Sequence, residues 1–498
     1  MDNKDIILAK QIASELNELG GTVYYVGGYV RDRILGNPIK DIDIELHNIA
    51  PYIAEDILSQ FGEVEKRMVN GTVAVLNIKG YDLDIAYPRT EIAIGKGHKD
   101  FNVKIDPYLP LELSAKRRDF TINALMENVL TGEIKDFYGG IDDLNNKIIR
   151  HVNDNTFIED PLRVLRACQF AARFNFAIAP ETMELCKTMD LSALSKERVA
   201  GELTKALLKS DKPSVFFNKL YESGHTSWFK EVYDLKGIRQ NEDYHPEKDA
   251  YDHTMYTIDE AADFRYMLEN KTHTLPFMLS ALCHDLGKAN TTTINDNGKI
   301  QSIGHENTGI ILAKQLLDRI YNNKTYTKYV CNMVELHMKP HMCFKDKAKT
   351  KTTNLMFDKS VAPEDLIYLV WCDSNGRDVE KLSFKELDKL LNRAFKENSY
   401  LIDRLLEYKD RIKQPFVTAD DLLNLGLEPS PLYKTILDKA WNMHLKGVDK
   451  PNVLKQIVNE LTGDDKKILS EALKKAESDK DIKTDNNSLD EQEDVSLD

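Results

Sequence analysis

The chain has 498 residues, 42% of them hydrophobic, which allows two to four domains with sizeable cores, and its scattered cysteines without a CxxC pair argue against a disulfide scaffold or a zinc ribbon. The net charge of −14 argues against a basic nucleic-acid-binding protein, although half of it lies in residues 477–498, so any RNA site must be a local basic track. Because no long apolar run or signal-peptide core occurs, we expect a cytoplasmic protein without a membrane span.

The segment from Val26 to Leu46 is the most informative part of the chain. It predicts a strand, a glycine turn at Gly27-Gly28, a helix over 29–35 and a second strand. On that second strand Asp41 and Asp43 project from one face, and the repulsion between them is relieved if Mg²⁺ lies between them. Alone, each motif is more often a turn or a solvated strand edge; together they suggest nucleotide chemistry.

The sequence around this unit predicts a small mixed sheet with helices. Asp84, on a neighbouring predicted strand, either joins the carboxylate pair or is an edge polar residue. Residues 89–115 have no periodicity and read either as a mobile substrate loop or as an ordinary surface connection. The cations Lys116–Arg118 precede a predicted helix, and they either reach a nucleotide pocket or lie in solvent.

Beyond Arg150 the pattern becomes helical. Asp160, Arg163 and Arg166 are spaced three apart and lie near one helix face. An adjacent aspartate and arginine can present acceptors and donors to the edge of a base. The alternative is an ordinary salt bridge between residues three apart.

A second constellation mixes histidines and carboxylates in a later helical stretch. His284 and Asp285 end an apolar helix over 277–283. Further candidates are His245, Glu247, His253, His305, His337 and Asp373. A single histidine here would more often be a core residue, but this mixture suits Mn²⁺, Ni²⁺, Co²⁺ or Zn²⁺. Residues 345–358 form a lysine-rich loop that could contact RNA, and two helices are expected within 416–461.

The ordered motifs GGYVRD with DID, KRRDFTINAL, FYGGIDDL, EDPLRVLR, KERVAGEL, HPE, DH, HDLGK and GHE resemble those of class II tRNA nucleotidyltransferases. This family comprises the CCA-adding enzymes and bacterial poly(A) polymerases, and the resemblance is strongest to the bacterial form with an HD phosphohydrolase domain. It implies an α+β fold with a polymerase-β-like mixed sheet and helices, followed by helical parts. The expected parts are a head domain at 1–150, a helical neck for base recognition at 151–235, an HD domain at 236–395, a helical tRNA-binding tail domain at 396–475 and an acidic disordered tail at 476–498.

The resemblance also implies roles for individual residues. Asp41 and Asp43 would hold Mg²⁺ and activate the tRNA 3′-hydroxyl for in-line attack on the α-phosphate, in a two-metal reaction with pyrophosphate leaving. The residues implied to bind the nucleotide are Gly28, Arg31, Arg118, Asp160, Arg163, Arg166 and Gln169, the last standing where many family members have arginine. His253, His284, Asp285 and Asp373 would bind a transition metal such as Ni²⁺ or Mn²⁺, and His305 and His337 could form a second site there.

The implied function is template-independent addition of C, C and A to the 3′ end of tRNA from CTP and ATP, by a monomer or homodimer. The HD part would add a phosphohydrolase activity on 2′,3′-cyclic phosphates or phosphomonoesters. Alternatives are a poly(A) polymerase or an enzyme adding only CC or only A. A further alternative makes the HD site the main activity, with the N-terminal part as a nucleotide sensor; a non-enzymatic RNA-binding protein is disfavoured because both sites look intact.

Overall fold

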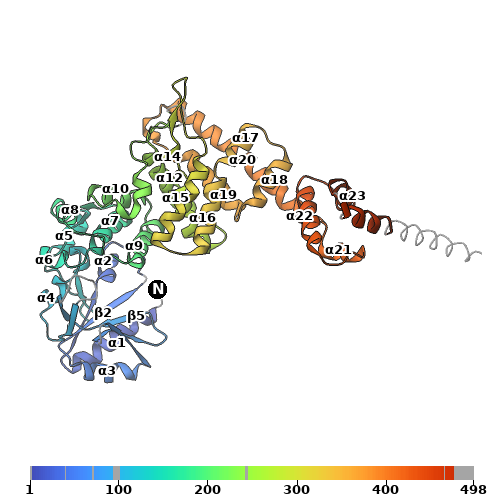
Figure 1. The fold of residues 1–498 in the computed structure, drawn as a ribbon. Coiled ribbons are helices and arrows are strands. Elements are labelled where there is room, and N and C mark those ends of the chain that lie inside the picture. The colour runs from blue at the N-terminus through green and yellow to red at the C-terminus, as the bar shows by residue number, and fades with distance from the viewer. Residues whose placement is uncertain are drawn as a thin grey trace, which may run out of the picture. The chain divides into compact units, whose positions relative to one another are not determined.

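The computed structural model describes residues 3–39, 41–69, 72–93, 101–241, 245–461, 463–464 and 466–475 (Figure 1). It divides into two compact units, which are described separately. The first comprises Met1–Tyr233 with Gln315–Asn323, and the second comprises Asp234–Lys314 with Lys324–Asp498. The predicted acidic tail at 476–498 lies outside the described residues.

The first unit is built around a mixed sheet of seven strands in the order β3-β4-β5-β2-β1-β8-β9. These strands are β1 (Thr22–Val26), β2 (Ile42–His47), β3 (Val64–Val69), β4 (Thr72–Ile78), β5 (Leu83–Ala86), β8 (Met126–Asn128) and β9 (Ile134–Lys135). Only β2 and β5 are paired in parallel within this sheet; the other neighbours are antiparallel. The minor strands are β6 (Arg89–Ala93) with β7 (Phe101–Ile105), and β10 (Ile148–Ile149) with β11 (Ala177–Ile178).

Helices cover the sheet and continue into an all-helical part. Helices α1 (Asn3–Glu18) and α3 (Pro51–Gln60) pack together below the sheet in Figure 1, and α2 (Gly28–Ile34) contacts β1 and β2 from the other side. The remaining helices of this unit are α4 (Leu111–Lys116), α5 (Gly140–Asn145), α6 (Asp154–Phe157), α7 (Leu162–Phe174), α8 (Pro180–Lys187), α9 (Lys196–Lys209), α10 (Ser214–Glu222) and α11 (Lys230–Tyr233). Helix α7 packs against both α9 and α10.

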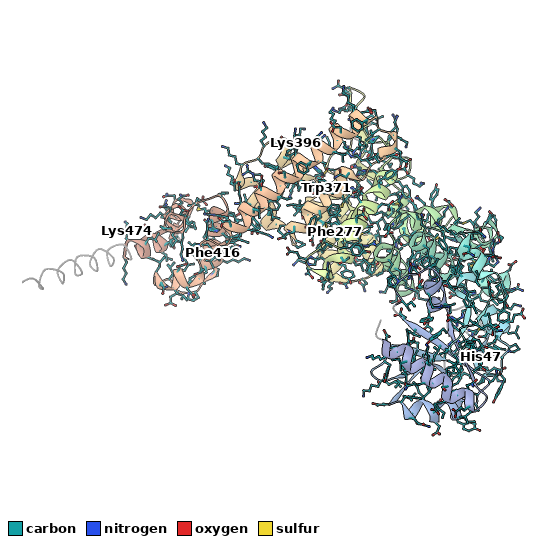
Figure 2. All side chains as sticks on the ribbon, turned by 180° about the vertical axis from the view of Figure 1, so that it is seen from behind. His47, Phe277, Trp371, Lys396, Phe416 and Lys474 are labelled. Carbon is teal, nitrogen blue, oxygen red and sulfur yellow. The ribbon has the colours of Figure 1, made fainter. Side chains whose placement is uncertain are left out.

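The second unit is almost entirely helical (Figures 1 and 2). Its helices are α12 (Ala250–Phe264), α13 (Thr274–Cys283), α14 (Lys288–Thr291), α15 (His305–Ile320, whose end belongs to the first unit), α16 (Lys324–Leu336), α17 (Met338–Lys345), α18 (Thr350–Lys359), α19 (Pro363–Asn375), α20 (Phe384–Arg411), α21 (Ala419–Asn424), α22 (Pro431–Leu445) and α23 (Lys450–Glu460). A short hairpin joins β12 (Thr293–Ile294) to β13 (Ile300–Gln301). Helix α13 is buried along its whole apolar length except at its first two residues.

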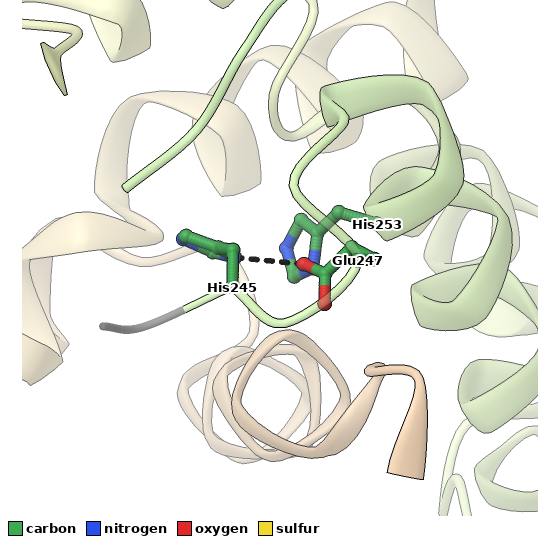
Figure 3. Close-up of side chains that lie close together, drawn as sticks. All are labelled: His245, Glu247 and His253. Atoms are coloured by element: carbon green, nitrogen blue, oxygen red, sulfur yellow. Dashed lines mark hydrogen bonds and ion pairs between the residues drawn. The ribbon is translucent and has the colours of Figure 1, made fainter. Parts of the chain in front are cut away.

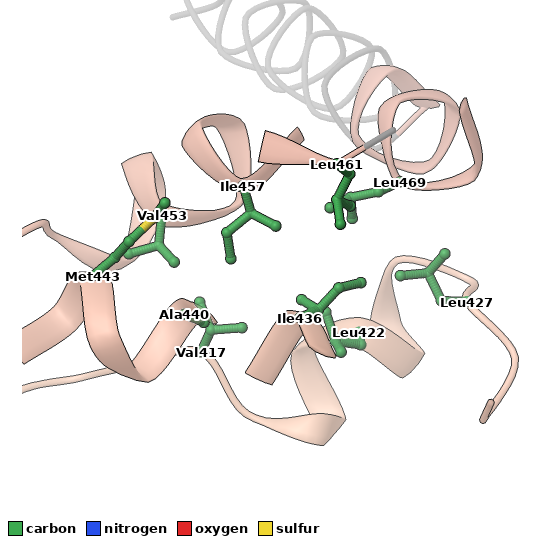
Figure 4. Close-up of a cluster of buried hydrophobic side chains, with 10 residues drawn as sticks. All are labelled: Val417, Leu422, Leu427, Ile436, Ala440, Met443, Val453, Ile457, Leu461 and Leu469. Carbon is green, nitrogen blue, oxygen red and sulfur yellow. The ribbon is translucent and has the colours of Figure 1, made fainter. Parts of the chain in front are cut away.

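The C-terminal helices have a core of their own (Figure 4). Val417, Leu422, Leu427, Ile436, Ala440, Met443, Val453, Ile457, Leu461 and Leu469 form this cluster. The sequence predicts two helices around the Pro-Ser-Pro turn at residues 429–431, and α21 and α22 lie on either side of it; α23 follows them.

The predicted α+β class, with an N-terminal mixed sheet followed by helical parts, is confirmed. Three local expectations differ from the structure. Residues 89–115 contain the β6–β7 hairpin and α4, with 94–100 outside the described residues. The segment after Arg118 forms only a 3-10 turn, Thr121–Asn123, before β8, and most of 345–358 is helix α18 rather than loop. Helix α20 also runs unbroken through the predicted boundary at residue 395. No helix in the described part of the chain is long and apolar enough to span a membrane.

Candidate functional site

Three carboxylates meet where β2 and β5 run in parallel. Asp43 lies directly opposite Asp84 in the strand register, and Asp41 precedes β2 on an exposed stretch. Burial raises the pKa of Asp43, and the negative charges of Asp84 and Asp41 raise it further, against the lowering effect of Arg118. Asp84 therefore joins the pair predicted from the sequence, although Asn77 also donates a hydrogen bond to its Oδ1 (2.6 Å). The cluster is a site of strong negative potential.

The backbone of the glycine turn passes between this cluster and a guanidinium. Gly27 has a φ of +65°, and a Cβ built there would lie 2.9 Å from Arg118 Nη1 and 3.8 Å from Asp43 Oδ2. A side chain at this position would therefore collide with the arginine as well as strain the backbone. At the next residue, Gly28, a Cβ would lie 3.5 Å from Arg31 Nη2.

A buried network fixes the position of Arg118. Its Nη2 lies 3.5 Å from Glu45 Oε2, two residues beyond Asp43 on the same strand face. Glu45 also accepts hydrogen bonds from Ser114 Oγ (2.5 Å) and His47 Nε2 (2.8 Å). Burial opposes ionisation of Glu45, but His47 and Arg118 outweigh it and lower its pKa to about 2. The ionised carboxylate therefore holds Arg118 beside Asp43.

Arg31, predicted to contact the triphosphate, is buried in the interior. Its Nε and Nη2 donate to the two carboxylate oxygens of Asp32 (2.9 and 2.8 Å), and its Nη1 donates to Asn123 Oδ1 (2.5 Å). The guanidinium also lies over the rings of Phe170 and Phe174 on α7. Every guanidinium nitrogen of Arg31 thus has a protein partner, and the residue ties α2 to α7.

The predicted base-reading residues lie together, but they do not pair with one another. Asp160 accepts two hydrogen bonds from Arg198 Nη2 on α9 (3.0 and 2.7 Å). Arg163 instead donates to two backbone carbonyls, those of Thr156 and of Arg117 (3.1 Å for the latter). The salt bridge between residues three apart is therefore absent from these described residues, and Asp160 is oriented from a different helix.

Two further predicted residues lie on α7. Arg166 donates from Nε to Asp119 Oδ2 (2.6 Å) and lies 3.8 Å from Glu202. Gln169 is 1% exposed, and its Nε2 makes no hydrogen bond to any described residue. One helical turn later, Arg173 Nη2 lies 3.4 Å from Asp32 Oδ2. No pattern in the sequence singles out Arg173.

In the second unit four histidines turn their Nε2 atoms towards Asp285. The Nδ1–H groups of His284, His305 and His337 donate to backbone carbonyls three residues earlier (2.7–2.8 Å), and His253 Nδ1 donates to the carbonyl of Gly376 (3.0 Å). Because a carbonyl can only accept, the proton lies on Nδ1 and Nε2 keeps its lone pair in the neutral ring. Burial and the neighbouring histidines lower the pKa of His337 to about 3, so its ring is neutral.

Asp285 stands between two pairs of these histidines. Its Oδ2 lies 3.2 Å from His284 Nε2 and 3.7 Å from His253 Nε2, while its Oδ1 lies 3.3 Å from His305 Nε2 and 3.9 Å from His337 Nε2. Asp373 completes the first pair, with Oδ1 2.9 Å from His253 Nε2. His284 Nε2 is buried and makes no hydrogen bond within the described chain. The geometry offers two adjacent metal positions that share one carboxylate.

Other residues hold these ligands in place. Glu247 Oε1 lies 3.0 Å from His245 Nδ1 and 3.2 Å from His253 Nδ1, and so braces the His253 ring (Figure 3). His341 bridges Asp373 Oδ2 (3.0 Å) and Glu397 Oε1 (2.8 Å). The sequence pattern predicts His245 and Glu247 as members of this cluster, but not His341 or Glu397. The spacing of four between His337 and His341 was the available signal for the former.

A glycine in the HDLGK motif permits this convergence. A Cβ on Gly287 would lie 2.0 Å from the carbonyl oxygen of His305, so only glycine lets the start of α15 approach so closely. Beside the cluster lies a cavity of about 770 Å³. Its lining combines cations with the carboxylates of Asp285, Glu306, Asp373 and Glu397; the cations are Lys288, Lys299, Lys345, Arg377 and Arg393. A cavity of this size, with cations beside carboxylates that could hold a metal, suits a phosphorylated small molecule.

Comparison with known proteins adds independent evidence. Residues 23–150 match the family described as the poly A polymerase head domain, and residues 175–235 match the probable RNA and SrmB-binding site of polymerase A. Over 305 residues the chain is 40% identical to a Multifunctional CCA protein of Chromobacterium violaceum, covering 60% of this chain and 70% of that protein. The chain belongs to the class II tRNA nucleotidyltransferase family. The family and the enzyme class predicted from the sequence are thereby confirmed.

Solved structures share the fold of this nucleotidyltransferase. The apo form II of a CCA-adding enzyme superposes with a TM-score of 0.62 at 21% identity, covering 93% of this chain and 97% of that one. The Thermotoga maritima CCA-adding enzyme complexed with tRNA-CCA gives a TM-score of 0.57 at 20% identity, covering 96% of both chains.

Proposed function

We propose that this nucleotidyltransferase adds C, C and A to the 3′ end of tRNA from CTP and ATP, with release of pyrophosphate. The observation that carries the proposal is the cluster of Asp41, Asp43 and Asp84 facing Arg118 across Gly27. The similar Chromobacterium violaceum protein is named a Multifunctional CCA protein, and the Thermotoga maritima enzyme of the same fold holds a tRNA.

The carboxylate cluster fits a divalent cation. Burial and the charges of Asp84 and Asp41 raise the pKa of Asp43, and a cation among these oxygens would favour its ionised form. Asp41 and Asp43 would hold Mg²⁺, which supplies Lewis-acid activation of the 3′-hydroxyl and of the phosphate. Arg118 would bind the triphosphate, because its guanidinium lies beside Asp43 and is partly exposed. Glu45 keeps that guanidinium in place.

Base selection is assigned to one face of α7 and to Asp160, two residues before that helix. Asp160 and Arg163 would present acceptor and donor groups to the incoming base, with Arg166 and Gln169 in the same pocket. Arg198 orients Asp160, since both carboxylate oxygens accept from its Nη2. To donate a hydrogen bond to a base, Arg163 must give up one of its two hydrogen bonds to backbone carbonyls. The identity of the nucleotide added thus depends on residues from two helices.

Primer extension tests the proposal. A tRNA ending at its discriminator base is incubated with CTP and ATP, and the 3′ ends are sequenced. We expect products extended by CCA, and loss of extension in Asp43→Ala. The matched control is Asp82→Ala, an exposed aspartate just before β5. An A tract added to any RNA would instead indicate a poly(A) polymerase, products ending in CC or A alone would indicate a partial CCA enzyme, and full activity of Asp43→Ala would refute the assignment of the carboxylates.

We propose a second function, a metal-dependent phosphohydrolase, for the histidine cluster. The specific observation is that four Nε2 atoms converge on Asp285 and Asp373. His253, His284, Asp285 and Asp373 would hold one transition metal such as Ni²⁺ or Mn²⁺, and His305 and His337 would hold a second through the other oxygen of Asp285. The metal would supply activation of water for attack on phosphorus.

Metal analysis combined with phosphatase assays tests this second function. The full chain is loaded with Mn²⁺ or Ni²⁺, and hydrolysis of 2′,3′-cyclic AMP and p-nitrophenyl phosphate is measured. We expect Asp285→Ala to lose both metals, and His305→Ala to lose about one of two equivalents. The control is His273→Ala, a histidine that pairs with Asp365 elsewhere in the unit. Unchanged hydrolysis in Asp285→Ala would refute the proposal, whereas CCA addition should persist in that variant.

A further inference from the structure

Helix α20 has two contrasting faces. Its buried face, with Ala394, Leu401, Leu405 and Tyr408, packs against α18 and α19. A second face carries large apolar side chains in water: Phe384 (87% exposed), Leu391 (49%), Phe395 (68%), Ile402 (43%) and Leu406 (59%). Single exposed apolar residues are normal on protein surfaces, but a continuous line of them marks an interaction site.

The spacing of these residues shows that they form one stripe. They follow one another at intervals of seven, four, seven and four residues, an 11-residue repeat that keeps the five side chains along one side of the helix, with the exposed polar residues Asp388 and Ser399 between them. Over the 28 residues of α20 the helix is about 42 Å long, so the stripe is long enough for side-by-side packing with a second helix. We name it the α20 stripe.

On one flank of the α20 stripe the charges change sign along the helix, although Asp388 lies within the stripe in the first half and Lys409 beside it in the second. The same flank carries Lys385, Lys389 and Lys396 in the first half, and Asp403 and Glu407 in the second half. Glu407 pairs with Arg404, but within the described chain no ion pair involves the three lysines or Asp403. Lys396 is visible on this helix in Figure 2. A flank with this order is complementary to itself when two copies run in opposite directions.

We propose that two copies of this chain associate through an antiparallel pair of α20 helices. With Phe395 near the two-fold axis, Lys389 faces Asp403 of the other copy and Lys385 faces its Glu407, while the two Lys396 side chains face each other at the axis. A parallel pair would gather all six lysines at one end. RNA is a poorer occupant, because the acidic half of the flank repels phosphates.

The oligomeric state of the full chain tests the proposal. Sedimentation equilibrium over a concentration series should give a mass near twice 57.0 kDa. We expect Phe395→Glu to give a monomer with an unchanged circular dichroism spectrum, because it removes the apolar contact at the axis and puts carboxylates into the buried interface. The control Ile311→Glu, on an exposed position of α15 (60%), should leave the dimer intact.

Charge reversal distinguishes the antiparallel arrangement. We expect Lys389→Asp or Asp403→Lys alone to raise the dissociation constant at least tenfold, and the double variant to restore it to near the wild-type value. A wild-type chain that is monomeric at every concentration would overturn the proposal. So would a double variant that dissociates as readily as the single ones, or a Phe395→Glu variant that stays dimeric. Weaker tRNA binding in Lys389→Asp with no change of mass would overturn it too, and would assign the stripe to RNA.

Discussion

The ion pair between Arg166 and Asp119 makes the sharpest prediction about the nucleotide-binding part. Asp119 is 8% exposed, and it accepts hydrogen bonds from Arg166, Asn123 Nδ2 (3.0 Å) and the amide of Phe120 (2.8 Å). Replacing Arg166 with methionine keeps much of the side-chain volume but leaves the carboxylate buried without its cation. We therefore expect Arg166→Met to destabilise α7 and its surroundings.

The magnitude follows from what remains around Asp119. Removing one partner of a buried ion pair costs about 3–5 kcal/mol in general. Here two hydrogen bonds remain, and the Arg166 side chain is 30% exposed, so water can reach part of the site. We therefore expect about 2–3 kcal/mol. The double variant Asp119→Asn/Arg166→Met should lower the stability by about 1 kcal/mol less than Arg166→Met alone, because residue 119 then carries no charge.

The pH dependence has a definite sign. Burial raises the pKa of Asp119, but Arg166 and Asn123 outweigh it and hold the pKa below its usual value. A carboxylate with a lowered folded-state pKa stabilises the fold above its unfolded pKa, near about 4, and this stabilisation is lost as the pH falls through the folded value. Without Arg166, only Asn123 and Arg163 oppose the effect of burial, so the pKa of Asp119 is lowered less than in the wild type. The difference in stability between the wild type and Arg166→Met should therefore become smaller as the pH falls below about 5.

Hydrogen exchange followed by mass spectrometry measures this effect locally, which matters because a chain of two units need not unfold in one step. We expect faster exchange of the amides of α7 in Arg166→Met at neutral pH, with little change in α22. Equal losses of local stability in Arg166→Met and in the double variant would refute the reasoning. So would unchanged exchange in α7 accompanied by slower CTP incorporation, which would mean that Arg166 acts on the nucleotide alone.

Three other changes give further predictions. Gly27→Ala should destabilise the fold by about 1–2 kcal/mol more than Gly36→Ala in calorimetry, because Gly27 combines φ +65° with ψ −127°, which strains any residue with a Cβ, and because Arg118 must also move away. Arg198→Met should raise the KM for CTP and ATP about tenfold in primer extension, because its carboxylate partner loses its orientation. Ile436→Ala should destabilise the C-terminal cluster by about 2–4 kcal/mol, measured by hydrogen exchange, whereas Leu423→Ala, at a 49% exposed position, should change little.

Patterns within a few residues of one another were predictable from the sequence. The alternation through Ile42, Asp43 and Ile44 predicts which side chains are buried, and both isoleucines are in the core. The pairing of Asp160 with Arg198 could not be predicted, because the two residues are 38 positions apart and only the packing of α7 on α9 joins them. The local spacing pointed to Arg163 instead, which was the nearest cation.

The buried position of Arg31 shows a second limit. An arginine after a glycine turn suggests a phosphate ligand, and the sequence does not reveal that Asp32, Asn123 and two phenylalanine rings surround it.

For the histidine cluster the members, but not their arrangement, could be predicted. The sequence indicated which residues gather, since several histidines and an adjacent His-Asp are unusual in one helical stretch. Only the helix packing shows that Asp285 turns one oxygen to each pair.

Helix α20 serves both the histidine cluster and the proposed dimer, from different faces. Glu397 reaches inward to His341, which holds Asp373, whereas Phe395 points out of the unit. The buried contacts of Leu401 do not involve the stripe, so the helix stays in place without a second copy. We therefore expect Phe395→Glu to abolish dimerisation without affecting metal binding. It should yield a monomer that binds as much Mn²⁺ as the wild type, measured by plasma mass spectrometry, whereas Glu397→Ala should weaken Mn²⁺ binding about tenfold or more and leave the dimer intact. Loss of Mn²⁺ binding in Phe395→Glu would show instead that the metal cluster depends on the second copy.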